Sequence, residues 1–150
     1  MEAAGQLAAA HTPWIGPQGQ RIERLELHLT CTCPNDCSFC SEDRRMGQFR
    51  QFAVSWGRIA RVLRTHAARG VKSLHLTGGE PTIHPRLVAV LALGRKLRMR
   101  TSVGTNGVML SRERFAAQAA PWLDEVMFSL HGPDAKSHDG LTRRAGSFDE

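Results

Sequence analysis

Apolar and polar residues alternate along residues 22–30, IERLELHLT, with leucines on one side of the pattern and charged or polar residues on the other. A period of two residues is typical of a strand with one buried face. Similar short runs occur three more times along the chain. The pattern predicts strands over residues 22–30, 71–77, 99–105 and 124–132.

Between these strands, apolar residues recur at three- and four-residue steps, as they do on the buried face of a helix. The first helix is expected to begin after a Ser55 cap and to end at Gly70, a residue type that favours helix C-termini. The second begins near Pro85, because proline suits a first helical turn. A short third helix is expected between a Ser111 cap and Pro121.

Strands that alternate with helices in this order predict an α/β fold with parallel strands and right-handed crossovers. Functional residues of such folds gather at the carboxyl ends of the strands. Four polar motifs follow the four predicted strands in turn: a cysteine loop, GGEP, TNG and SLHG. We therefore expect them to meet on one side of the sheet.

The two ends of the chain differ from this pattern. Residues 1–20 show no periodicity and are expected to form a tail, which leaves 21–150 as one domain. The last residues, GSFDE (146–150), are expected to open a fourth helix. A helix that stops where it starts indicates a truncated polypeptide.

Composition narrows the class of protein. The chain has 150 residues and a net charge of +6, with arginines spread along it. Because the basic excess comes without a basic and aromatic motif, we do not expect nucleic-acid binding. No stretch of about 18 apolar residues and no secretory signal is present, so we expect no membrane segment and a cytoplasmic, reducing location.

All four cysteines lie within CTCPNDCSFCSE, residues 31–42. A reducing compartment disfavours disulfides, and the spacing is too compressed for two zinc knuckles. Cys33, Cys37 and Cys40 follow a C-x3-C-x2-C spacing, which can offer three thiolates to three irons of a cubane. A ferredoxin-type cluster or a zinc loop remains an alternative.

The turn Gly78-Gly79-Glu80-Pro81 is the second candidate for chemistry. Two glycines allow a close approach between the backbone and a ligand, and a nearby carboxylate can hold an ammonium group. The alternative is a tight turn with a solvated glutamate.

CPNDCSFC resembles the C-x3-C-x-aromatic-C signature of the radical S-adenosylmethionine (radical SAM) superfamily, with Phe39 in the aromatic position. The resemblance implies that Cys33, Cys37 and Cys40 ligate a [4Fe–4S] cluster whose fourth iron binds the amino and carboxylate groups of S-adenosylmethionine. It implies reductive cleavage to a 5′-deoxyadenosyl radical that abstracts hydrogen from a substrate. Cys31 lies outside the signature, as a nonligand thiol or a fourth ligand.

The later motifs extend the resemblance over about residues 22–150. GGEP is similar to the turn that binds the methionine amino group in this superfamily, and the TNG motif places Thr105 and Asn106 at the pocket. Residues 128–150 resemble an S-L-H/D-G…H-D…G-S-F stretch. This resemblance implies that Ser129 contacts the ribose or carboxylate of the cofactor. It also implies that His131 and His138 are candidate polar groups facing the site. For each histidine, a surface or hydrogen-bonded role is the alternative.

The remaining polar residues are assigned structural roles. The strand histidines His28, His75 and His84 are expected to serve packing or local hydrogen bonds. Arg143 and Arg144 are expected in a solvated loop, with contact to an anion as the alternative.

The resemblance covers the first four βα units of a partial, TIM-like (βα)6 barrel. It implies a radical SAM enzyme with an unassigned catalytic residue, a reductant such as flavodoxin or ferredoxin, and a peptide, cofactor precursor or small metabolite as substrate. The alternative function is a non-catalytic iron–sulfur or zinc-binding module.

Overall fold

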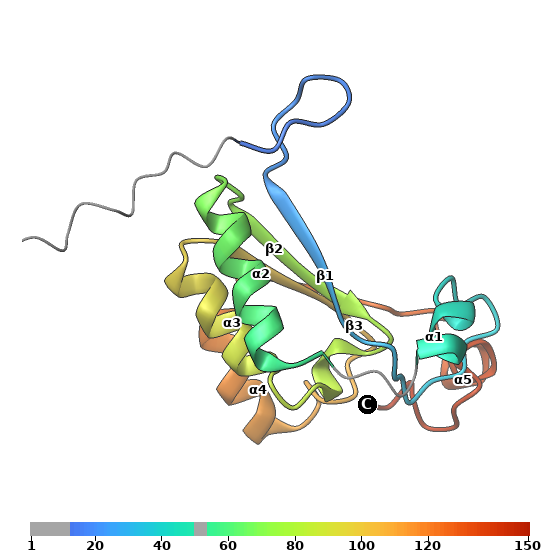
Figure 1. The fold of residues 1–150 in the computed structure, drawn as a ribbon. Helices are drawn as coiled ribbons and strands as arrows, with labels where there is room; N and C mark the ends of the chain where they lie inside the picture. Colours follow the sequence, from blue (N-terminus) through green and yellow to red (C-terminus); the bar gives the residue numbers. More distant parts are fainter. Residues whose placement is uncertain (1–12, 50–53) are drawn as a thin grey trace, which may run out of the picture.

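Four parallel strands form the centre of the protein (Figure 1), which we describe from a computed structural model over residues 13–49 and 54–150. Their order in the sheet is the order in the sequence: β1 (Arg24–Thr30), β2 (Ser73–Gly78), β3 (Arg100–Thr105) and β4 (Glu125–Phe128). Each crossover therefore adds its strand next to the preceding one, as in a barrel. The predicted α/β fold with a parallel sheet is confirmed.

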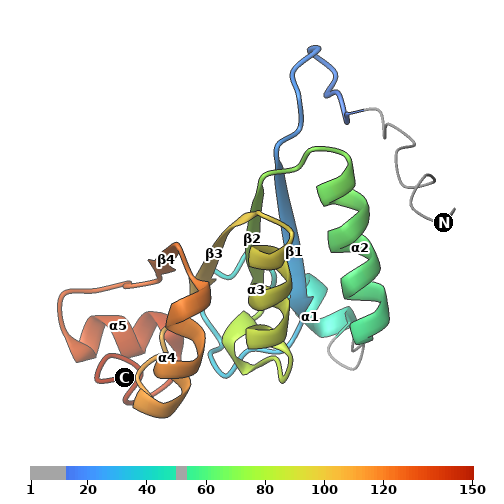
Figure 2. The ribbon, with the colours of Figure 1, turned by 90° about the vertical axis from the view of Figure 1, so that its left-hand side faces the viewer.

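Three helices cover one face of this sheet (Figure 2): α2 (Trp56–Ala68), α3 (Leu87–Lys96) and α4 (Glu113–Ala119). The predicted Ser55 cap is present, since the side chain of Ser55 accepts a hydrogen bond from the backbone of Arg58. The core lies between sheet and helices and is almost entirely aliphatic. Its most deeply buried members are Leu29, Ile59, Leu63, Leu74, Leu76, Leu87, Val90, Leu91, Met99 and Val103.

Two short helices lie at the carboxyl ends of the strands, away from this layer (Figure 1): α1 (Asp43–Phe49) and α5 (Ala135–Thr142). The sequence pattern predicted neither. The expected helix over 146–150 is wrong, because the helix of this unit is α5, several residues earlier. Asp134 caps α5 by accepting a 2.8 Å hydrogen bond from the backbone of Ser137.

Several element boundaries also differ from the prediction. β4 ends at Phe128 rather than at residue 132, because β3 ends at Thr105 and the backbone of Ser129 makes the last inter-strand bond, to Thr105 at 2.9 Å. Ser111 does not cap α4; its hydroxyl donates to the carbonyl of Val108 in the preceding turn.

The expected tail includes residues that the structure places against the domain. Ile15 and Arg21 form an antiparallel bridge. Trp14 meets the ring of His66 edge-on at 4.6 Å between ring centroids, and the guanidinium of Arg69 lies 4.8 Å from the Trp14 ring. Residues 1–12 of this expected tail lie outside the described part of the chain.

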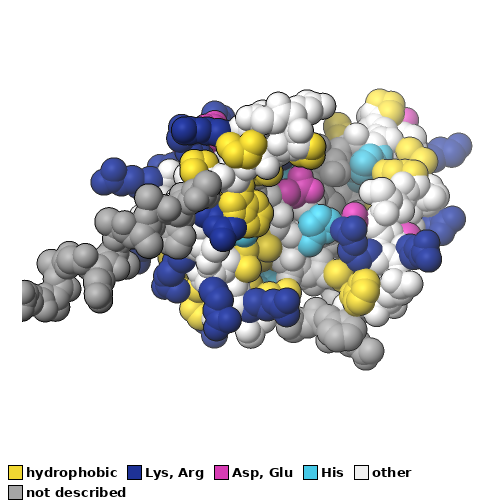
Figure 3. All heavy atoms as spheres, turned by 45° about the horizontal axis from the view of Figure 1, so that its top comes forward, with side chains coloured by type: hydrophobic (Ala, Val, Ile, Leu, Met, Phe, Trp, Pro, Cys, Tyr) yellow, Lys and Arg dark blue, Asp and Glu magenta, His cyan; other side chains and the backbone are white. Residues whose placement is uncertain are grey.

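Basic side chains are dispersed over the surface seen from the amino ends of the strands (Figure 3). They alternate there with apolar and uncharged side chains and form no continuous basic block. Within the described residues, no helix combines the length and the apolar character required to cross a bilayer.

Candidate functional site

The predicted motif loops meet at the carboxyl ends of the strands, around one cavity of about 270 Å³. Residues from all four strand ends line it. Ten of these residues were predicted from the sequence: Cys33, Cys37, Cys40, Gly78, Gly79, Glu80, Thr105, Asn106, Ser129 and His131. Segments more than 90 residues apart in the chain thus share one site.

The cysteine loop supplies three thiols to the cavity wall. All four cysteines of the chain are free and half-buried, and Cys31 is absent from the residues that line the cavity. Burial raises the pKa of Cys33 to about 11 and also raises the pKa of Cys37. These thiols therefore carry protons that binding of a metal would displace.

The two glycines of the GGEP turn bring β2 against the cysteine loop. Gly78 has φ +129°, and a Cβ atom on either glycine would collide with the backbone oxygen of Thr30 or Thr32. The turn is bonded to the same backbone, from Gly79 to Thr30 at 2.8 Å and from Glu80 to Thr32 at 2.9 Å. Glycine is therefore required here because the backbone of the turn packs directly against the backbone at the start of the cysteine loop.

Glu80 is 1% exposed, so it is not the solvated glutamate of the alternative interpretation. Its Oε1 accepts hydrogen bonds from the backbone and hydroxyl of Thr82, at 2.9 and 2.5 Å, and from the hydroxyl of Thr105 at 2.8 Å. Its Oε2 accepts from the backbone of Asn106 at 2.8 Å. The carboxylate therefore joins the GGEP turn to the TNG turn and fixes both at the cavity wall.

Asn106 links this junction to the cysteines. Its side-chain amide lies 3.9 Å from Sγ of Cys33, within reach of an N–H···S hydrogen bond. Its side-chain oxygen accepts a 3.1 Å bond from Val108, which closes the TNG turn. The TNG motif thus positions a donor toward a thiol.

Three of the residues predicted at the site, Phe39, Pro81 and His138, are not part of the cavity wall. Phe39 is 52% exposed and packs edge-on against His131, with 4.6 Å between ring centroids. Pro81 is buried at the start of the short 3-10 helix η1 (Pro81–Ile83). His138 is also buried, and its Nδ1 accepts a 3.1 Å hydrogen bond from the backbone of His131.

The segment that contains α5 packs directly on the cysteine loop. The backbone amides of Asp36 and Ser38 each donate a 3.0 Å bond, to the carbonyls of Thr142 and Leu141. Asp139 accepts from Gly146, Ser147 and Phe148 at 2.6, 3.0 and 2.9 Å, which fixes the turn after α5. The α5 segment, which follows about one hundred residues later in the sequence, therefore holds the cysteine loop in place.

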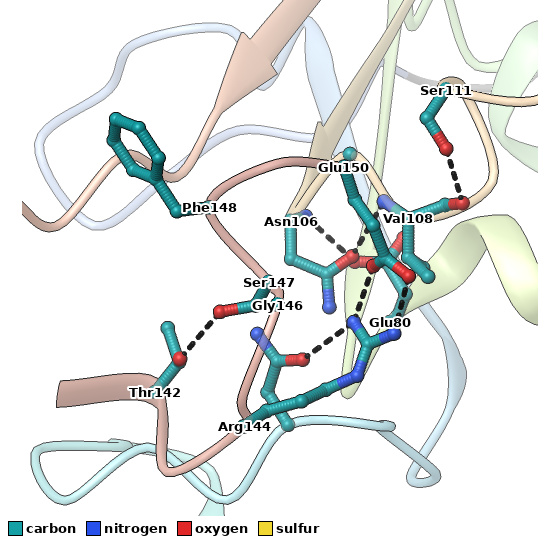
Figure 4. A network of polar contacts seen from close by, with 12 residues as sticks. Glu80, Asn106, Val108, Ser111, Thr142, Arg144, Gly146, Ser147, Phe148 and Glu150 are labelled. Atoms are coloured by element: carbon teal, nitrogen blue, oxygen red, sulfur yellow. Dashed lines mark hydrogen bonds and ion pairs between the residues drawn. The ribbon is translucent and has the colours of Figure 1, made fainter. Parts of the chain in front are cut away.

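Arg144 lies in this turn and is not in a solvated loop, as Figure 4 shows. Its guanidinium donates to both carboxylate oxygens of Glu150, at 2.5 and 2.6 Å, and to the side-chain oxygen of Asn35 at 3.5 Å. The bidentate bond to Glu150 raises the pKa of Arg144. The side chain of Arg143, its neighbour, makes an exposed contact with Asp36, at 3.5 Å.

The face of the sheet opposite the helices is polar. One row crosses all four strands, since Glu26, His75, Ser102 and Glu125 are successive register partners. His75 Nδ1 lies 2.9 Å from the hydroxyl of Ser102, and burial lowers the pKa of this histidine. Because His75 also lines the cavity, a polar wall extends from the motif loops along the sheet.

Sequence reasoning missed six residues of the cavity wall: Asn35, Met46, His75, Thr77, Gly104 and Met127. Three of them were detectable. The strand alternation places His75 and Thr77 on the face opposite the buried leucines of β2, and Asn35 lies inside the cysteine signature. Met46 belongs to α1, which was not predicted.

A more open hollow of about 770 Å³ lies at the amino end of β3, lined by Arg95, Lys96, Arg98, Met99, Arg100, Trp122 and Asp124. Its acid, Asp124, is bonded to Arg95 at 2.7 Å and to the backbone of Thr101 at 2.7 Å. None of the predicted motifs contributes to this hollow. The cavity at the carboxyl ends is therefore the candidate site.

The Radical SAM superfamily model matches residues 27–150, which include every motif at the cavity. The chain belongs to the radical SAM superfamily. PqqA peptide cyclase from Methylocella silvestris is 32% identical over 124 residues, covering 83% of this chain and 33% of that protein. GTP 3′,8-cyclase 1 from Pseudomonas aeruginosa is 41% identical over 146 residues, covering 93% of this chain and 42% of that protein.

Solved structures of one protein, SuiB, share the fold. Streptococcus suis SuiB bound to S-adenosylmethionine matches with a TM-score of 0.64 at 23% identity, over 82% of this chain and 27% of SuiB. SuiB bound to its precursor peptide SuiA matches with a TM-score of 0.69 at 24% identity, over the same shares. The chain spans less than half the length of each of these proteins.

The superfamily implies a [4Fe–4S] cluster and S-adenosylmethionine, and the donor set fits the cluster. Three free thiols border one cavity, and thiolates are the usual ligands of iron–sulfur clusters. Among the residues that the structure describes, no three His, Cys, Asp or Glu side chains converge on the position of one metal ion. The thiols border a shared space instead of meeting at a point.

Proposed function

We propose that this protein is a radical SAM enzyme that binds a [4Fe–4S] cluster and S-adenosylmethionine. One observation carries the proposal: the three signature thiols share their cavity with the GGEP turn, the TNG turn and Ser129. When bound, the cluster supplies an electron that cleaves the sulfonium of S-adenosylmethionine and yields a hydrogen-abstracting 5′-deoxyadenosyl radical.

The residues of the chain have separate tasks in this proposal. Cys33, Cys37 and Cys40 hold the cluster. Residues 78–80, whose backbone lies at the cavity, take the amino group of the methionine part of the cofactor. Ser129 contacts its ribose or carboxylate. Phe39 supports the site from outside the cavity, through its ring contact with His131, which lines the cavity.

Glu80 acts mainly through other residues. Its oxygens already accept four hydrogen bonds from Thr82, Thr105 and Asn106. Holding the two turns rigid keeps the binding groups at fixed distances, which favours an ordered ligand. The buried carboxylate also attracts a bound ammonium group by its negative charge.

The substrate is proposed from the relatives and the polar wall. The names of the relatives denote cyclases of a peptide, PqqA, and of GTP. A peptide, cofactor precursor or small metabolite with polar groups suits the row of Glu26, His75, Ser102 and Glu125 along the sheet. A cytoplasmic location and a reductant such as flavodoxin or ferredoxin complete the proposal.

The experiment uses the full-length protein that contains this chain, prepared without oxygen and loaded with iron and sulfide. Reductive formation of 5′-deoxyadenosine is measured in the wild type, Cys37→Ala and Cys31→Ser. We expect loss of cleavage in Cys37→Ala and retention in Cys31→Ser. Undiminished cleavage in Cys37→Ala would overturn the proposal.

The alternative, a non-catalytic module, is separated by metal analysis of Cys31→Ser beside Cys40→Ser. If Cys31 is a fourth ligand, both variants lose bound metal. If Cys33, Cys37 and Cys40 hold the cluster and leave the fourth iron for the cofactor, only Cys40→Ser loses bound metal. Bound zinc in the wild type would favour the module in either case.

A further inference from the structure

Asn35 occupies the centre of the cysteine loop and is 6% exposed. It bonds two of the three thiols. It lines the cavity together with Cys33 and Cys37. A hydrogen bond from its backbone to Cys33 and one from its side chain to Cys37 each act to lower the pKa of the thiol, against the larger effect of burial. A single residue thus presents hydrogen-bond donors to two proposed cluster ligands.

The orientation of this side chain is set by Arg144. A carboxamide has an acceptor oxygen and a donor nitrogen, so the group that bonds the oxygen decides where the nitrogen points. Arg144 donates to the side-chain oxygen of Asn35 at 3.5 Å. The nitrogen is left to face the thiol of Cys37.

Arg144 is itself immobilised. Two short bonds to Glu150, at 2.5 and 2.6 Å, form a planar fork that fixes the guanidinium. The backbone around it is held by the bonds that Asp139 accepts from the backbone amides of Gly146 and Phe148. A chain of contacts therefore extends from Glu150 through Arg144 and Asn35 to the sulfur of Cys37.

We infer that Asn35, oriented by Arg144, is a positioning residue that raises the reduction potential of the cluster held by Cys33, Cys37 and Cys40. Hydrogen bonds to the sulfurs of an iron–sulfur cluster stabilise its reduced, more negative state. The inference rests on the proposed function, because it requires that cluster. Asn106, 3.9 Å from Cys33, adds a donor from the other side of the cavity.

Arg143 provides a matched control within the same turn. It carries the same charge one residue away, but its contact is Asp36, with side chains 58% and 74% exposed. Water screens such a pair, so its removal has little effect on the cluster. A general effect of positive charge near the loop would act through both arginines, whereas orientation of Asn35 acts only through Arg144.

The test is a redox titration, followed by electron paramagnetic resonance, of the full-length protein loaded with iron and sulfide. Wild type is compared with Asn35→Ala, Asn35→Asp, Arg144→Ala and Arg143→Ala. We expect a shift to more negative potential in both Asn35 variants, a smaller shift in the same direction in Arg144→Ala, and no shift in Arg143→Ala. Thermal unfolding of the metal-free variants by circular dichroism establishes that each one folds.

Wild-type potentials in folded, loaded Asn35→Asp and Arg144→Ala would overturn this inference. Asn35→Asp preserves the shape of the side chain, so it carries the test if Asn35→Ala does not fold. Equal shifts in Arg143→Ala and Arg144→Ala would also overturn it, in favour of a general charge effect. If the wild type loads a cluster and cleaves S-adenosylmethionine, the proposed function stands in each of these cases. A wild type that holds no cluster overturns both the proposed function and the inference about Asn35.

Discussion

The carboxylate of Glu80 accepts a 2.8 Å hydrogen bond from the hydroxyl of Thr105, and this bond joins the carboxyl ends of β2 and β3. Both residues are almost fully buried. Each belongs to a motif that resembles a cofactor-binding turn, yet the two motifs bind one another as well as bordering the cavity. The junction explains why a charged residue is retained in the interior next to the thiols.

Glu80→Gln is expected to destabilise the fold, although it barely changes the size of the side chain. Every bond to Glu80 comes from a donor, so the amide nitrogen of glutamine would face a donor and leave it unpaired. An unsatisfied buried donor costs about 1–3 kcal/mol. Chemical denaturation of the metal-free protein measures this loss, with exposed Glu113→Gln as a control whose effect is close to zero; equal stability of Glu80→Gln would contradict the account.

Gly78→Ala and Gly79→Ala are expected to displace the cysteine loop, because a Cβ atom at either position collides with the backbone of Thr30 or Thr32. Overpacking of this kind costs about 1–3 kcal/mol. Gly57→Ala is the control, since a Cβ there meets no atom within 4 Å. Thermal unfolding should show a lower midpoint for the first two variants and an equal or higher one for Gly57→Ala; a loop that tolerates both alanines disproves the close approach.

Acid sensitivity should depend on Asp124. The backbone bond from Thr101, followed by the nearby Arg95, holds the pKa of Asp124 below its ordinary value of 3.8. A carboxyl group with a depressed folded pKa stabilises the fold above pH 3.8, and this contribution disappears as the pH falls through the folded pKa. Asp124→Asn should therefore unfold at a lower temperature than the wild type near neutral pH.

The same difference should shrink as the pH is lowered below 3.8. Melting temperatures measured across that range provide the comparison. Glu23→Gln removes an exposed ion pair with Lys72 and should show little difference at any pH. A gap between wild type and Asp124→Asn that stays constant with pH would be inconsistent with the depressed pKa.

Asp139→Ala should loosen the cysteine loop without removing any residue of the cavity wall. Asp139 fixes residues 146–148, and the neighbouring carbonyls of Leu141 and Thr142 bond the loop. Hydrogen exchange followed by mass spectrometry should show faster exchange over residues 35–40 in this variant. Exchange in β2 should stay unchanged, and unaltered exchange in the loop would show that the α5 segment does not support it.

Much of the fold follows from local patterns. The helix after Ser55 combines a cap, an apolar face and a terminal glycine, and these local signals agree with its packing. The strands were recognisable because apolar residues on one face, leucines in β1 and β2, Val103 in β3 and Val126 in β4, belong to the core or pack against it. Short elements were harder, since α1 and α5 have seven and eight residues and little apolar periodicity.

Residues of the cavity wall could be predicted where they belong to a sequence motif. Contacts between residues that are distant in the sequence could not be predicted. Cys33 was marked by the spacing of the cysteines, and Glu80 and Asn106 by the GGEP and TNG motifs that follow predicted strands. The bond from Arg144 to Asn35 joins residues 109 positions apart, and no local pattern indicates it. Ser147 and the residues around it resembled a helix start, but Asp139 accepts bonds from the backbone amides of Gly146 and Phe148 and from the hydroxyl of Ser147, which hold them in a turn.

The most direct test of the account is the electron paramagnetic resonance spectrum of the reduced, loaded protein before and after addition of S-adenosylmethionine. If Cys33, Cys37 and Cys40 leave one iron open, the spectrum of a [4Fe–4S] cluster changes when the cofactor binds. A cluster spectrum that the cofactor leaves unchanged, or a protein that holds no cluster, would contradict the account.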